Sequence, residues 1–404
     1  MKKVIIALLV LLPFSAIAEK MVSVIHAGTL LDIAGQDPKL EYSVVVEGNK
    51  IIDVQKGYIE RDSATIIDMR DKFVMAGLFD AHIHMAEGDL NNSDANAADH
   101  ALMGVVNSRK VLMAGFTTVR DLGARDNTLY KVIKSIEDGD VPGPRIIPGG
   151  IIIGVGSRDN GRECNGIESC RKTTRDMIRD GAKWIKIRSS CRGGQLCANE
   201  DGAPIFFDEE IETIIGVAKK YNIPVATHSH TRDSSLQVLK YDIDSLEHGT
   251  FMNEAAMDMM IEKGVIYVPT MANLDETEAV ATNPDIDPIY AEHNMKFVTR
   301  HPKTLLKAFE KGVVIATGTD GDGRNAGTNY REIEYFVKSG IPIADTLKMA
   351  TLNSAQLLGL KDELGSIEIG KIADIIAMDA SPLEDVKNVR LVSFVMRDGI
   401  IHKK

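Results

Sequence analysis

Aromatic side chains and positive charge are scarce in this chain. It has one tryptophan, aromatic residues make up 5% of its 404 positions, and 47 lysines and arginines face 58 aspartates and glutamates. The resulting net charge of −11 excludes a basic field that would attract phosphates, so we expect no nucleic-acid partner. The hydrophobic content of 44% is ordinary for a globular protein, and the length favours one large domain with a smaller one.

Long apolar runs are also rare, and the one that stands out lies at the start. Lys2 and Lys3 precede the apolar segment 4–12, which is too short to span a bilayer comfortably, and small residues follow up to Ala18. This pattern predicts a secretory signal peptide over residues 1–18, with a retained membrane anchor as the alternative. We therefore expect a periplasmic or secreted protein without membrane contact after cleavage.

The chain has four cysteines, which lie in two pairs six positions apart. They are Cys164, Cys170, Cys191 and Cys197. An oxidising compartment favours disulfides, and four cysteines allow three pairings. Local loops closed by Cys164–Cys170 and Cys191–Cys197 are the first expectation. A zinc site of four thiolates is the alternative, although the spacing is not CxxC.

Phosphate-binding loops of the GxGxxG or GxxxxGK[ST] type are missing after the first strand-like run. Eight apolar strand-like runs alternate instead with helical segments, for example 97–114, 208–221, 253–263 and 302–311. The runs are "MAGLFDAHIH", "FTTVRDLG", "GPRIIPGGIII", "AKWIKIRSS", "IPVATHSH", "DIDSLEHG", "GVIYVPTM" and "GVVIATGTD". The alternation predicts a (β/α)8 TIM barrel over residues 74–360, with a doubly wound open sheet as the runner-up.

Short β-like runs separated by turn residues fill both ends of the chain. They occupy residues 19–73 and 361–404. We expect the two ends to combine into one small composite β-sandwich domain beside the barrel.

The stretch "FDAHIHM" places His82 and His84 two residues apart at the end of an apolar run. Residues i and i+2 of a strand point to the same face, so these imidazoles would project side by side. Further polar side chains stand at or near the ends of later strand-like runs, where a barrel gathers its active site. They are Lys186, His228, His230, His248 and Asp320.

Five of the ten histidines therefore share one predicted rim, and this distribution indicates a metal site. Imidazole and carboxylate suit zinc, and also manganese, iron, cobalt or nickel. Such ions make hydroxide available near neutral pH, and two of them can share it. Asp320 would take its proton and pass it to the leaving group.

Lys186 does not fit a cationic site by itself, because metal ions would repel its amine. The order HxH, Lys, His, His, Asp along the strands resembles the amidohydrolase superfamily. The segments "TLKMATLNSAQLLGL", "LGSIEIGKIADIIAMD" and "GFTTVRDLG" resemble its imidazolonepropionase-like branch. The resemblance implies that CO2 converts Lys186 to a carbamate that bridges two divalent metal ions. It assigns His82, His84 and Asp320 to one ion, and His228 and His248 to the other.

The lysine further implies the binuclear members of the superfamily. These include prolidase-type dipeptidases that cleave Xaa-Pro or Xaa-Arg/Lys bonds, and ochratoxin-hydrolysing amidases look related. The resemblance therefore implies a dipeptidase or an N-acyl amino acid hydrolase acting on a small molecule or dipeptide. A homo-oligomer is compatible with the resemblance. A hydrolase of cyclic amides, lactones or phosphate esters is the alternative within the enzymes. An inactive barrel that binds a ligand outside the cell is the alternative of another class.

Substrate contacts are less sharply predicted than metal ligands. Dipeptidases of this branch often have a substrate-binding tyrosine two residues after the strand-five histidine, where this chain has His230. His230 is expected to bind the scissile carbonyl or the substrate carboxylate, or to support a metal ligand. A carboxylate also suits the planar fork of an arginine. The candidates in the adjoining loops are Arg158, Arg162, Arg188 and Arg192.

Overall fold

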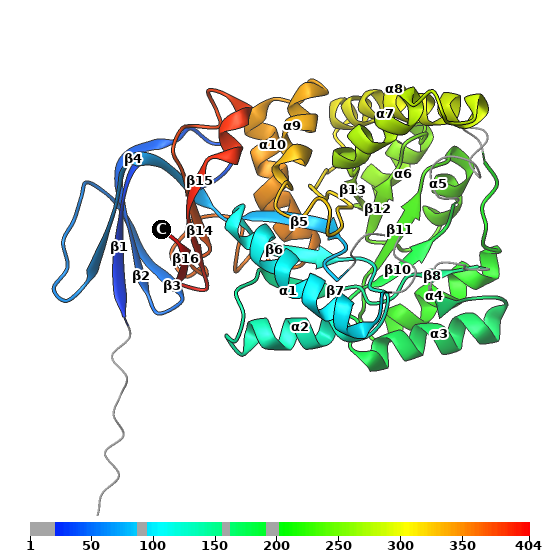
Figure 1. Cartoon of the computed structure of the whole chain (residues 1–404), viewed down its shortest axis with the longest axis horizontal. Helices are drawn as coiled ribbons and strands as arrows, with labels where there is room; N and C mark the ends of the chain where they lie inside the picture. The colour runs from blue at the N-terminus through cyan, green and yellow to red at the C-terminus, as the bar shows by residue number, and fades with distance from the viewer. Residues whose placement is uncertain (1–20, 87–94, 156–161, 191–201) are drawn as a thin grey trace, which may run out of the picture.

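The computed structural model describes residues 21–86, 95–155, 162–190 and 202–404. The predicted signal peptide, Arg158, Arg192, Cys191 and Cys197 lie outside these ranges. The fold is of the mixed α/β type, with a β-rich part at one end and strands surrounded by helices at the other (Figure 1). Within the described ranges, no helix combines the length and apolarity needed to cross a lipid bilayer.

Strands from both ends of the chain form one seven-stranded sheet, in the order β16-β15-β14-β4-β1-β2-β3. Their bounds are β1 (Val22–Leu31), β2 (Lys39–Glu47), β3 (Lys50–Lys56), β4 (Thr65–Ala76), β14 (Ile375–Met378), β15 (Val392–Arg397) and β16 (Ile400–Lys403). The joining of the chain ends is confirmed. A sandwich of two packed sheets is not shown, because all seven strands belong to one sheet. Its edge strand approaches the chain before β14, where Ile51 N donates to Lys371 O at 2.9 Å.

The remaining strands form two parallel sheets, of three and six strands. The first contains β5 (Leu78–Ile83), β6 (Phe116–Asp121) and β7 (Arg145–Pro148). The second contains β8 (Ile153–Gly154), β9 (Arg162–Glu163), β10 (Ile185–Arg188), β11 (Val225–Ser229), β12 (Ser245–His248) and β13 (Ile266–Val268). Every residue of β5, β6, β11 and β12 is buried, polar ones included.

Helices lie between most of these strands, as the alternating pattern predicts. Their bounds are α1 (Ala97–Met113), α2 (Thr128–Glu137), α3 (Ile167–Asp180), α4 (Asp208–Lys220), α5 (Arg232–Val238), α6 (Glu254–Lys263), α7 (Leu274–Thr282), α8 (Pro288–Lys311), α9 (Tyr330–Lys338), α10 (Ile343–Lys348) and α11 (Ser354–Leu357). The short 3-10 helix η1 (Met271–Asn273) precedes α7. The helices expected at 97–114, 208–221 and 253–263 match α1, α4 and α6 closely.

The helix expected at 302–311 is longer than predicted. Asp287 caps α8 by accepting from Ile289 N at 2.9 Å, and the helix ends at Gly312, whose φ is +88°. Pro302 lies in its interior, where it removes one backbone hydrogen bond. The buried face of α8, with Phe297 and Leu305, continues through that position, so tertiary packing outweighs the local cost.

The strand expected at 312–320 is the main correction. This segment makes one isolated bridge, Ile315 with Tyr267, and Gly321 directly after it makes another with Ile83. Backbone hydrogen bonds still attach it to β13 and to β5, through Ala316 N to Tyr267 O and Ala81 N to Thr317 O. A side chain at Gly318 would clash with Val268 and His82. This close approach, together with the left-handed backbone of Asp320, explains the departure from regular strand geometry.

A partly buried ion-pair network, with Asp374 buried at its centre, joins the seven-stranded sheet to the start of β7. Arg145 binds Asp374 at 2.9 Å and Asp398 at 2.7 Å, and Asp374 also accepts from Asp398 N at 2.8 Å.

Breaking a buried pair by removing one partner leaves an uncompensated charge. We expect Asp374→Asn to lower the free energy of unfolding by about 3 kcal/mol in urea denaturation. The exposed pair Arg61–Asp53 supplies the control, since Asp53→Asn should cost no more than about 1 kcal/mol. If both substitutions lower the free energy of unfolding equally, the network does not stabilise the contact between the seven-stranded sheet and β7.

Candidate metal centre

A cavity of about 330 Å³ opens where β5, β10, β11 and β12 end. All seven side chains that the sequence pattern singled out for the rim line it, and Arg188 does so too. The other described lining residues are Ile152, Asn273, Glu276, Thr277, Asp322, Arg324 and Asn325. Residues separated by up to 243 positions of the chain, from His82 to Asn325, therefore share one polar pocket.

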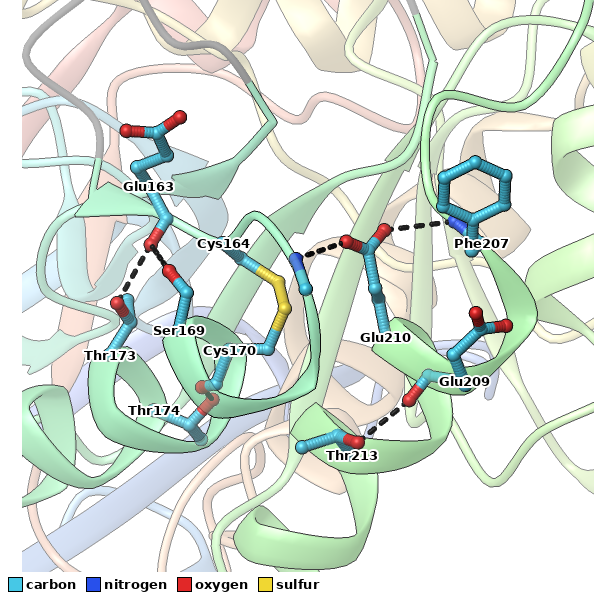
Figure 2. The surroundings of a disulfide bond; sticks show 11 residues. Glu163, Cys164, Ser169, Cys170, Thr173, Thr174, Phe207, Glu209, Glu210 and Thr213 are labelled. Atoms are coloured by element: carbon cyan, nitrogen blue, oxygen red, sulfur yellow. Dashed lines mark hydrogen bonds between the residues drawn. A yellow bond between two sulfur atoms is a disulfide. The ribbon is translucent and has the colours of Figure 1, made fainter.

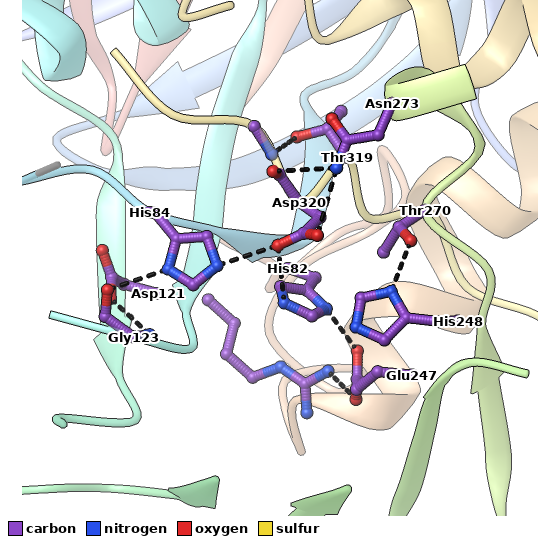
Figure 3. Close-up of polar contacts among 12 residues, drawn as sticks. His82, His84, Asp121, Gly123, Glu247, His248, Thr270, Asn273, Thr319 and Asp320 are labelled. Carbon is purple, nitrogen blue, oxygen red and sulfur yellow. Dashed lines mark hydrogen bonds and ion pairs between the residues drawn. The ribbon is translucent and has the colours of Figure 1, made fainter. Parts of the chain in front are cut away.

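His82 and His84 converge with Asp320 on one side of this cavity, as Figure 3 shows. The Nε2 atoms of the two imidazoles lie 3.2 Å and 2.8 Å from Oδ1 of Asp320. The other carboxylate oxygen, Oδ2, accepts from Asn273 Nδ2 at 3.1 Å. The i, i+2 spacing thus produces the side-by-side pair that the sequence predicts.

Each of these imidazoles is oriented through its second nitrogen. Nδ1 of His82 lies 2.8 Å from Glu247, and Nδ1 of His84 lies 2.8 Å from the carbonyl oxygen of Gly123. In His248, Nδ1 lies 2.7 Å from the hydroxyl of Thr270 (Figure 3). An outer hydrogen bond of this kind fixes the tautomer and ring orientation of a metal-binding histidine. It leaves Nε2 as the donor atom for an ion in the cavity.

The backbone is strained where it presents these groups. Asp320, His248 and Thr270 have φ angles of 52°, 69° and 60°, in the left-handed region that non-glycine residues rarely adopt. Such conformations persist where the surrounding structure imposes them, and they gather at functional sites. Sequence inspection gave no signal for this feature, because none of the three residues is glycine.

A buried charge pair beneath His82 was also missed from the sequence. Arg120 binds the Glu247 carboxylate at 3.0 Å, donates to Ala81 O at 2.6 Å, and stacks on Trp184 at 4.3 Å from the ring centre. Burial alone would raise the pKa of Glu247, but the charges of Arg120 and Lys186 lower that pKa to about 2. Glu247 is therefore ionised and can hold His82 in place. The sequence signal that could have revealed Glu247 is its position on β12 directly before His248.

Asp80, the first residue of the "DAHIH" stretch, ties β5 to the Asp320 segment. It accepts from Thr319 N at 3.1 Å, from the Thr319 hydroxyl at 2.6 Å, and from Asn329 Nδ2 at 2.6 Å. It also accepts from His82 N at 3.1 Å. One buried carboxylate thus fixes the spacing between the HxH pair and Asp320.

Lys186 reaches the same cavity from β10 and is 2% exposed. Its Nζ has no hydrogen-bond partner among the described residues, which is costly for a buried amine. Burial lowers its pKa to about 8, although the nearby carboxylates of Glu247 and Asp320 act in the opposite direction. The surrounding imidazoles do not stabilise the ammonium form, whereas an anionic carbamate on this nitrogen would suit divalent ions. The residues present therefore fit the metal centre that the sequence pattern implies.

His228, His230 and His248 form the other side of the cluster. Their ring centres are 4.7 Å, 4.6 Å and 4.5 Å apart in the pairs 228–230, 230–248 and 228–248. One ring nitrogen of each lies within 4.8 Å of the others, as do donor atoms of His82, His248 and Asp320. These two overlapping groups could hold two ions.

The described part of the chain contains one of the two predicted disulfides. Cys164 and Cys170 form a disulfide beside Glu210, which accepts from Gly166 N at 2.7 Å and ties the loop to α4 (Figure 2). A site of four thiolates is therefore wrong for this pair.

Arg162 does not line the cavity and instead forms an ion pair with Asp180. Among the described arginine candidates, Arg188 is the one that reaches the cavity.

The part of the chain that contains the cavity residues also matches a known protein family. Residues 73–402 match the Amidohydrolase family. The chain belongs to the amidohydrolase family. It is therefore a hydrolase that acts on carbon–nitrogen bonds, in a family that depends on metal ions.

Several relatives support this assignment along nearly the whole chain. Ochratoxinase of Aspergillus niger is 28% identical over 433 aligned positions, which cover 95% of this chain and 87% of that protein. A Xaa-Pro dipeptidase crystallised with methionine in its active site is 33% identical, with a TM-score of 0.87, and covers 95% of this chain and 100% of its own. The crystal structure of A. niger ochratoxinase has 26% identity and a TM-score of 0.83, covering 95% and 96%.

Proposed function

We propose that this amidohydrolase is an exported binuclear metalloenzyme, a dipeptidase or an N-acyl amino acid hydrolase. The supporting observation is the buried amine of Lys186, which has no hydrogen-bond partner in the described part of the chain and lies in a cavity lined by five histidines and Asp320. Conversion of that amine to an anionic carbamate would allow it to bind two cations, which would repel the ammonium form. Similarity to a Xaa-Pro dipeptidase and to ochratoxinase supports amide cleavage.

We further propose that the two parallel sheets form the wall of a (β/α)8 barrel. Support comes from the backbone hydrogen bonds that connect segment 314–320 to β13 and β5, and from Lys183 N, which donates to Pro148 O at 2.8 Å between β7 and β10. In such a barrel the strand ends converge on one face, which accounts for the shared cavity.

In this proposal the cavity residues hold the metal ions, transfer a proton and bind the substrate. When bound, divalent ions lower the pKa of water and polarise the scissile carbonyl. His82, His84 and Asp320 would hold one ion, and His228 and His248 the other, with carboxylated Lys186 between them. Asp320 would accept the proton of the attacking water and deliver it to the leaving nitrogen. Arg188 would bind a substrate carboxylate through its planar fork.

A substrate panel tests this function. Protein loaded with zinc or manganese should hydrolyse Xaa-Pro or Xaa-Arg/Lys dipeptides or N-acyl amino acids, and chelation should reduce the rate more than about 100-fold until metal is restored. The C-terminal amide of the best substrate should react more slowly, because it offers Arg188 no carboxylate. Turnover confined to lactones or phosphate esters, or no turnover at full metal occupancy, would contradict the proposal.

A further inference from the structure

His230 occupies a position that repeats the geometry of the HxH pair. It lies two residues after His228 at the end of β11, as His84 does after His82 at the end of β5. Its N–H donates to the Ser190 hydroxyl at 2.9 Å, and its carbonyl accepts from Phe251 N at 2.8 Å. The backbone is thus held between the ends of the neighbouring strands.

The ring of His230 is fixed on its outer side. Nδ1 lies 2.9 Å from the hydroxyl of Thr250, and the ring packs edge-to-face on Phe297 with centres 5.2 Å apart. His248 has the same arrangement, with Nδ1 against the hydroxyl of Thr270. In both rings the remaining nitrogen on the cavity side is Nε2. This is how a protein orients an imidazole that binds a metal ion.

The ring also lies against two proposed ligands. It stacks on His248 at an interplanar angle of 20° and meets His228 at 86°. One nitrogen from each of the three rings falls within 4.8 Å of the others, a spacing compatible with a common ion. Three histidines are an established ligand set for zinc.

We infer that His230 is a third imidazole ligand of the ion held by His228 and His248. The inference rests on the metal site of the proposed function and goes beyond it, because there this ion is held by two histidines and the bridging lysine. A histidine that only contacts substrate would affect KM. A ligand would affect the affinity of one ion in the absence of any substrate.

His230→Asn separates these roles. The asparagine amide can occupy the place of Nδ1 and keep the contact with Thr250, while no atom remains where Nε2 stood. His100→Asn is the matched control, because Nδ1 of His100 also has a partner, Asp126 at 2.9 Å, but His100 does not line the cavity. Thr250→Val supplies a second test that retains the imidazole and removes only its orienting hydroxyl.

Apoprotein of each variant is titrated with Co²⁺ and with Zn²⁺, following bound equivalents, dissociation constants and the visible Co²⁺ spectrum. We expect two equivalents in the wild type and in His100→Asn. In His230→Asn one of the two equivalents should have its dissociation constant raised about 10- to 100-fold, with an altered spectrum, and in Thr250→Val raised about tenfold.

Wild-type affinity and spectrum for both equivalents in His230→Asn would overturn the inference, whatever happens to KM. A wild type that binds one equivalent would overturn it together with the two-metal part of the proposed function. Two equivalents with the expected losses, but no amide hydrolysis by the wild type, would leave the ligand assignment standing and reject the proposed function alone.

Discussion

Asp320→Asn is expected to reduce kcat/KM for the best amide substrate by about 10³- to 10⁴-fold. The carboxylate lies within 3.2 Å of both imidazoles of the HxH pair, and Asn273 holds its second oxygen. An asparagine has nearly the same shape but cannot accept a proton from water, so proton transfer to the leaving nitrogen is lost. It is also a weaker ligand than a carboxylate.

Metal analysis separates these two effects. If Asp320→Asn still binds both ions at saturating metal, the residual rate measures the loss of proton transfer. Asp285→Asn is the control, because Asp285 is an exposed aspartate outside the cavity lining. A loss smaller than about tenfold with full metal occupancy would show that another group moves the proton.

Lys186→Met should abolish activity and yet stabilise the metal-free protein. Methionine has a similar unbranched shape and no charge, so it fills the space without an unpaired amine. Loss of the bridging group should lower kcat/KM by more than about 10³-fold and remove at least one ion, since a two-metal site then lacks its shared ligand. A short carboxylic acid added to the smaller variant Lys186→Ala should restore part of the activity.

The stabilisation depends on pH in a defined direction. Below pH 8 the amine is protonated in both folded and unfolded chains, so the folded apoprotein bears the full cost of the buried charge. Between pH 8 and 10.5 the folded state loses its proton first, and the free energy of unfolding rises by about 3 kcal/mol. Lys186→Met should lack this rise and should therefore be about 3 kcal/mol more stable than apo wild type at pH 7.

Urea denaturation of chelated protein at pH 7 and at pH 10 measures the difference. Lys183→Met is the control, because Lys183 lies three residues earlier and is exposed. If Lys186→Met is destabilised at pH 7, or if both substitutions behave alike, the amine is not an unpaired buried charge. The functional role assigned to Lys186 would then lose its physical basis.

Local sequence patterns predicted much of the fold correctly. Helices α1, α4 and α6 match their predicted ranges because amphipathic periodicity and end signals act within a few residues. Asn253 caps α6 through Ala256 N, and Gly264 ends it with a φ of +71°. The strand at 312–320 and the start of α8 were predicted incorrectly. In both places contacts with distant residues, around Gly318 and on the buried face at Phe297, outweigh local propensity.

By itself, the sequence determined that the five histidines, Lys186 and Asp320 would reach one cavity, because the spacing of strand-like runs and the period of two within a strand are local properties. Only the tertiary structure decided how those side chains are held. Arg120 and Glu247 beneath His82, Asp80 between β5 and the Asp320 segment, and the left-handed backbone of His248 depend on contacts between residues far apart in the chain. Such contacts arise when the strands pack together, so no local pattern encodes them.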